Sequence, residues 1–105
     1  MNAQELSEYI LNQLKGLEDI RCTPMLNGYI FYYKNKMFGG IYAKGFMVKD
    51  TKAAREAMPD TRPWPPFDGG KDMLPVTIIH YGDELKAMIQ AMYPELPEVQ
   101  PIGKQ

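Results

Sequence analysis

The sequence has very few of the side chains on which catalysis and metal binding most often depend. Among its 105 residues are one cysteine, Cys22, and one histidine, His80. A structural zinc site takes four Cys or His ligands and a catalytic one takes three protein ligands, so two such residues exclude an ordinary zinc site. A single cysteine also cannot form a disulfide within the chain, which favours a cytoplasmic protein. We expect no metal and no other cofactor.

Excess positive charge and long apolar runs are also missing. The 12 basic residues are balanced by 13 acidic ones, which leaves a net charge of -1. A protein that depends on the phosphate backbone normally carries a strong positive bias, so any contact with nucleic acid requires a local basic patch. No apolar segment approaches the ~20 residues that cross a bilayer, and the first residues lack the pattern of a secretory signal. We therefore expect a cytoplasmic protein without membrane contact.

Catalytic motifs are absent as well. The glycine pairs Gly39-Gly40 and Gly69-Gly70 lack the G-x-x-x-x-G-K-[ST] pattern of a phosphate-binding loop. Cys22 and His80 are the only residues able to form a thiol–imidazole pair. They fall in different predicted strands, and ordinary packing or exposure is the simpler interpretation. The acidic residues form no evident carboxylate cluster, so we expect a protein that is not an enzyme.

The remaining composition, 45% hydrophobic and 24% charged, is typical of one small globular domain with a single core. Residues 1–93 are predicted to form that domain. Residues 94–105 contain three prolines among mostly polar residues, a composition that buries little surface. We predict a flexible C-terminal tail over this range.

The amino-terminal residues predict a helix. Asn2 is suited to cap it, because Glu5 stands three residues later, as in a capping box. Apolar residues such as Ile10 and Leu14 then follow at helical spacing. Gly16 is predicted to end the helix.

Residues 25–49 have the pattern of an antiparallel β-meander punctuated by glycines. β-Branched and aromatic residues over 20–33 predict one long strand, with a bulge at Asn27-Gly28. Turn residues separate this strand from further strands at 37–43 and 46–49.

The second half alternates helix and strand signals. Asp50 or Thr51 is predicted to cap a short helix that ends at Pro59. Alternation over 73–81 predicts another strand, and the Pro-rich residues before it allow a short edge strand. Asp83 is predicted to cap a last helix, whose apolar stripe packs on the sheet. That stripe consists of Leu85, Met88, Ile89, Met92 and Tyr93. The resulting order is α-β(3)-α-β(2)-α, an α+β fold with an antiparallel β-meander and packed helices.

Four stretches of the sequence together carry a family resemblance. They are ELSEYILNQLKGL, MLNGYIFYYKNKMFGGIY, FMVKDTKAA and the closing MYPELP. In combination they resemble the N-terminal domain of the TfoX (Sxy) competence regulators, and the chain looks like a short stand-alone bacterial member of that family. The resemblance implies the same α-β(3)-α-β(2)-α order and a fold similar to that of secretion chaperones.

The resemblance also implies a regulatory function without catalysis. The longer relatives regulate genes of natural transformation and carry a second domain that has no counterpart in this sequence. No catalytic residue is established for the family's first domain, so none is carried over. We expect a regulatory or protein-interaction domain with a protein partner, and a homodimer by analogy with secretion chaperones.

Basic residues gather in one part of the sequence. Residues 34–55 hold six basic residues against the single acid Asp50, a net charge of +5, and the rest of the chain is net -6. In a meander, several of these lysines lie at the same end of the sheet. We name this set the basic end: Lys34, Lys36, Lys49 and Lys52. Contact with nucleic acid through the basic end is the alternative function, and solvated lysines that keep a sheet edge soluble are the simpler interpretation.

The proline-rich loop holds the second candidate surface. Trp64, the only tryptophan, and Phe67 stand in the stiff segment PWPPF. Trp64 either covers part of the core or acts as an aromatic anchor for a partner. The complete candidate interaction surface is therefore Lys34, Lys36, Lys49, Lys52, Trp64 and Phe67.

Overall fold

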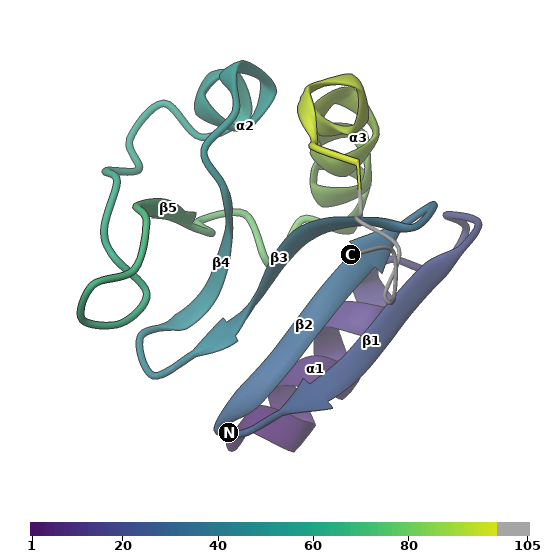
Figure 1. Ribbon diagram of the computed structural model, residues 1–105. Helices are drawn as coiled ribbons and strands as arrows, with labels where there is room; N and C mark the ends of the chain where they lie inside the picture. Colours follow the sequence, from purple (N-terminus) through teal and green to yellow (C-terminus); the bar gives the residue numbers. More distant parts are fainter. Residues whose placement is uncertain (99–105) are drawn as a thin grey trace.

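The computed structural model describes residues 1–98, which form an α+β fold (Figure 1). The elements are α1 (Ala3–Gln13), β1 (Ile20–Met25), β2 (Gly28–Tyr33), β3 (Lys36–Tyr42), β4 (Gly45–Lys49), α2 (Lys52–Ala57), β5 (Met73–Pro75), α3 (Gly82–Met92) and the 3-10 helix η1 (Tyr93–Glu95). The strands form one antiparallel sheet in the order β1-β2-β3-β4-β5, which confirms the predicted meander. Every helix in this part of the chain is too short or too polar to span a bilayer.

The core lies between one face of the sheet and the helices. A row of paired strand residues on this face includes Phe31, Val48 and Leu74, all fully buried. Ile10 of α1 and Leu85 of α3 are equally buried and belong to the same cluster. Figure 1 shows α1 lying behind β1 and β2. The opposite face of the sheet therefore points away from the helices.

The helix α1 begins with the predicted capping box. The Asn2 side chain accepts a hydrogen bond from the Glu5 backbone N–H at 2.8 Å, and the Glu5 carboxylate accepts one from the Asn2 backbone N–H at 2.9 Å. These bonds satisfy two amide groups that have no partner within the helix. Gly16 follows the helix end with φ +104°, a conformation that glycine adopts without steric cost.

The predicted long strand over 20–33 is wrong, because the chain reverses within it. β1 and β2 pair as an antiparallel hairpin in which Met25 lies opposite Gly28. Leu26, 95% exposed, and Asn27 make the connection. A Cβ atom on Gly28 would lie 1.9 Å from the Ile41 carbonyl oxygen of β3, so only glycine allows this approach. Four strands thus precede α2.

A β-bulge does occur, but it lies between β2 and β3. Tyr32 pairs with Met37 and Phe31 pairs with Gly39, which leaves Phe38 as the extra residue. Phe38 is fully buried and its ring centre lies 5.9 Å from that of Phe31. The bulge therefore adds a second aromatic ring to the core.

The strand predicted over 73–81 is wrong beyond Pro75. Proline cannot donate a ladder hydrogen bond, and the backbone N–H of Tyr81 instead bonds to the Ile78 carbonyl in a turn. One strand therefore follows α2, extended only by an isolated bridge between Trp64 and Met73. The observed order is α-β(4)-α-β-α rather than α-β(3)-α-β(2)-α.

The last helix is confirmed, with a different first residue. Tyr81 rather than Asp83 is the N-cap of α3, and Asp83 lies in the first turn, where the helix dipole stabilises its negative charge. Four residues of the predicted stripe are buried: Leu85, Met88, Ile89 and Met92. The stripe packs into the core, as its spacing predicts.

Packing continues past the predicted domain end at residue 93. Leu96 is only 4% exposed, and Glu95 makes hydrogen bonds to α2. The first residues of the predicted 94–105 tail are thus attached to the domain. Residues 99–105 of that prediction lie outside the described residues.

Candidate binding surface

A hollow of about 530 Å³ lies on the sheet face that points away from the helices. Strand residues on this face alternate with those of the core, and Tyr42 of β3 and Met73 of β5 both contribute to it. The apolar lining, which we call the hollow's floor, consists of Met37, Tyr42, Pro66, Phe67, Met73 and Leu96. Its volume falls within the ~300–1,000 Å³ typical of ligand pockets. The Pro-rich loop supplies one wall and the residues after η1 another.

Tyr42 and Phe67 form the aromatic part of the floor. A Cβ atom on Gly40 would lie 3.0 Å from the Tyr42 hydroxyl oxygen, so the tyrosine ring extends back along β3 over this glycine. The Phe67 ring centre lies 6.2 Å from that of Tyr42. Burial raises the pKa of Tyr42, and the neighbouring Tyr32 raises it further. The Tyr42 phenol therefore stays protonated at neutral pH and keeps its hydrogen for donation.

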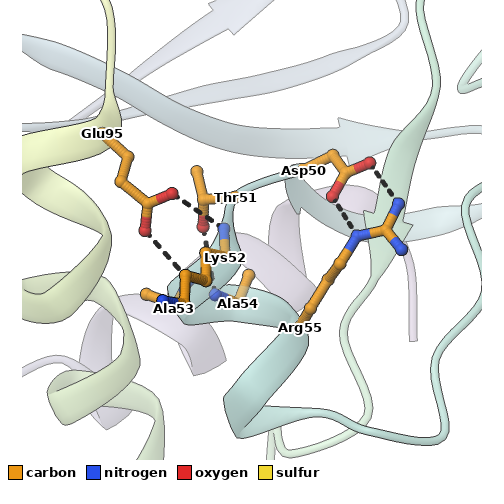
Figure 2. Close-up of polar contacts among 7 residues, drawn as sticks. All are labelled: Asp50, Thr51, Lys52, Ala53, Ala54, Arg55 and Glu95. Carbon is orange, nitrogen blue, oxygen red and sulfur yellow. Dashed lines mark hydrogen bonds and ion pairs between the residues drawn. The ribbon is translucent and has the colours of Figure 1, made fainter.

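Five charged residues surround this floor: Lys49, Asp50, Lys71, Asp72 and Glu95. Two of the acids have partners of their own, as Figure 2 shows. Asp50 binds the Arg55 guanidinium through both oxygens at 2.6 and 2.7 Å, and this contact lowers the pKa of Asp50.

Glu95 connects the C-terminal residues to α2 (Figure 2). Its carboxylate accepts the backbone N–H groups of Lys52 at 2.8 Å and Ala53 at 2.9 Å. The Thr51 hydroxyl accepts the next one, from Ala54, at 3.0 Å, as the predicted N-cap requires. Asp50 and Glu95 are thus compensated, whereas within residues 1–98 neither lysine of the hollow pairs with an acid.

Replacing Glu95 by glutamine should lower the free energy of unfolding by about 1–2 kcal/mol, because a neutral amide retains one acceptor where the carboxylate supplies two charged ones. Urea denaturation followed by circular dichroism measures the change. Glu18→Gln is the control, since Glu18 is also exposed and makes no hydrogen bond within the described residues. Equal stabilities of the two variants would contradict a structural role for the Glu95 contact.

The basic end gathers around η1. Lys36 Nζ lies 4.3 Å from the centre of the Tyr93 ring and donates to the Tyr93 carbonyl at 3.4 Å. Lys34 Nζ lies 5.9 Å from the same ring centre. Lys52 begins α2 beside Glu95, and Lys49 lines the hollow. The structure thus places a carboxylate among the four predicted lysines, a feature that their spacing in the sequence does not indicate.

The predicted aromatic residues of the Pro-rich loop are both solvent-accessible. Trp64 is 51% exposed and Phe67 is 59% exposed. Lys44 Nζ lies 4.5 Å from the centre of the Trp64 ring and donates to the Pro65 carbonyl at 3.0 Å. This contact holds the indole beside the β3–β4 turn. Trp64 therefore presents about half of its surface to solvent while its other face is supported.

Cys22 and His80 have separate environments. His80 Nδ1 lies 2.6 Å from the Tyr9 hydroxyl of α1. Cys22 packs against the core from β1, and burial raises the pKa of its thiol. A nucleophilic cysteine needs the opposite shift. Within residues 1–98, no three His, Cys, Asp or Glu side chains are grouped as metal ligands would be.

No family model, curated protein or solved structure matches the chain. The resemblance to the competence regulators therefore rests on the sequence motifs alone.

Proposed function

We propose that this protein is a non-enzymatic interaction domain that binds a protein partner at the hollow. The observation that carries this proposal is the exposure of Trp64 and Phe67 by 51% and 59% on and beside an apolar floor. Large aromatic side chains at the centre of a contact contribute most of the binding energy in many protein interfaces. A stiff loop that already holds them in place also reduces the entropy lost on binding.

The sequence motifs support a regulatory role. They resemble those of the N-terminal domain of the TfoX competence regulators, and we propose a bacterial, cytoplasmic protein of that kind. The single cysteine, half-buried and protonated, is compatible with a reducing compartment. A homodimer remains part of the proposal by analogy with secretion chaperones.

The absence of catalysis is proposed on chemical grounds. The thiol of Cys22 is shifted away from the nucleophilic form, and His80 contacts a phenol rather than a thiol. General-base activation of a cysteine requires the imidazole within hydrogen-bond reach of the sulfur. These two residues support packing functions instead.

Nucleic-acid binding through the basic end is the second candidate. The convergence of Lys34 and Lys36 on Tyr93 favours it, since a cation beside an aromatic ring suits a phosphate next to a stacked base. The Glu95 carboxylate and the net charge of -1 oppose it. We therefore rank it second.

Affinity purification separates the two functions. The tagged chain is incubated with lysate of the host, with and without nuclease, and bound protein and nucleic acid are both measured. The proposal predicts a protein partner whose recovery is unchanged by nuclease. Recovery that disappears with nuclease would instead support the basic end, and recovery of neither species would contradict both functions.

A further inference from the structure

We propose that the hollow recognises an acidic peptide segment in which an apolar side chain stands beside carboxylate groups. This inference rests on the proposed function, because it identifies the chemistry of the partner that the interaction domain binds. It combines two properties of the same site, the apolar floor and the charge of the lysines around it.

The floor determines the apolar half of the ligand. Tyr42 and Phe67 offer ring faces with centres 6.2 Å apart, and Met73 and Met37 lie beside them. Methionine side chains adapt to ligands of different shape. A volume of about 530 Å³ suits a short segment with one or two apolar side chains.

The surrounding charges determine the polar half. Asp50 is neutralised by Arg55, and Glu95 is compensated by the first amide groups of α2. Lys49 and Lys71 then outnumber Asp72 among the charged groups without such partners in the described part of the chain. Opposite charges across a contact orient the partner and exclude wrong ones. A carboxylate-bearing ligand therefore fits this site better than a basic one.

A peptide is favoured over nucleic acid by the small number of cations. Two lysines accompanied by Asp72 give little compensation for a row of phosphates. A peptide with one or two carboxylates matches the charge of the site. The Tyr42 hydroxyl, protonated at neutral pH, adds a hydrogen-bond donor for the same ligand.

Selection from a library of random seven-residue peptides displayed on phage tests this inference. The wild-type chain is expected to enrich sequences that combine Asp or Glu with an aromatic or aliphatic residue. A synthetic peptide of the enriched sequence should bind Lys49→Gln and Lys71→Gln each about five-fold more weakly, the effect of losing one partly exposed ion pair. Lys15→Gln, at the end of α1, should leave the affinity unchanged.

Two further outcomes would overturn the inference while the proposed function stands. If nuclease-resistant recovery of a protein partner persists but the library yields no enriched sequence, or only neutral or basic ones, the hollow does not recognise acidic peptides. If 3-phenylpropionate alone binds as tightly as the enriched peptide, the site takes a small carboxylate rather than a peptide. Loss of both partner recovery and enrichment would contradict the function as well.

Discussion

Replacing Phe31 by alanine is expected to lower the free energy of unfolding by about 3–5 kcal/mol. Phe31 is fully buried at the centre of the sheet, with the rings of Phe38 and Phe46 centred 5.9 and 5.6 Å away. Alanine would leave a cavity that these rings cannot close, because the strand backbone fixes their positions. Since small domains are stable by only ~5–15 kcal/mol, this variant should be close to unfolding at 25 °C. Guanidinium denaturation measures the loss.

Phe67→Ala is the matched control for this prediction. The chemical change is identical, but Phe67 is 59% exposed on the Pro-rich loop. It should lower the free energy of unfolding by less than about 1 kcal/mol, as most surface substitutions do. Similar losses in the two variants would contradict the assignment of Phe31 to the core and of Phe67 to the binding surface.

Gly39→Ala is expected to destabilise the protein by about 3 kcal/mol or more. A Cβ atom at this position would lie 2.3 Å from the Met47 carbonyl oxygen and 3.0 Å from the Val48 Cα atom. Both belong to the backbone of β4, so the side-chain rotations that relieve ordinary overpacking are not available. The strands must separate, and their hydrogen bonds weaken. Thermal unfolding should show a large decrease in Tm.

Gly69→Ala separates this clash from the general cost of replacing glycine. Gly69 has φ +80°, and a methyl group on its Cα would have no neighbouring atom within 4 Å, so only the backbone conformation is penalised. That penalty is about 1–2 kcal/mol. A loss at Gly39 no larger than the loss at Gly69 would show that the approach of β4 is not what requires glycine.

Local signals in the sequence predicted the parts of the fold that depend on neighbouring residues. The capping box at Asn2, the N-cap at Thr51 and the positive φ of 67° at Asn35 are all present. Each depends on hydrogen bonds or steric effects within a few residues. The same reasoning located the apolar stripe of α3, whose spacing is a property of the helix itself.

Features that depend on distant residues were not predicted. A turn and a bulge at Asn27-Gly28 have the same local chemistry, and the approach of Ile41 from β3 accompanies the turn. Gly39-Gly40 was interpreted as a bend or a contact with a helix, whereas for Gly39 the neighbour is the backbone of β4. Sequence order does not contain these pairings.

The binding surface was predicted only in part, for the same reason. Lys49 and Phe67 were selected from charge and composition, and both line the hollow. Tyr42, Lys71 and Glu95 were not selected, because they come from three separate segments. The alternation of β3 gave the only signal for Tyr42, and no local pattern marks Glu95 as a contact of α2.

The most direct test of binding at the hollow is recovery of the partner by two single variants with matched side chains. Phe67 and Tyr81 are both aromatic and both 59% exposed, but Tyr81 lies at the start of α3 and does not line the hollow. Nuclease-treated lysate is passed over equal amounts of tagged wild type, Phe67→Ala and Tyr81→Ala. We predict that Phe67→Ala loses most of the partner while Tyr81→Ala retains it. Full recovery by Phe67→Ala, or loss only in Tyr81→Ala, would place the binding surface elsewhere and contradict the proposed function of the hollow.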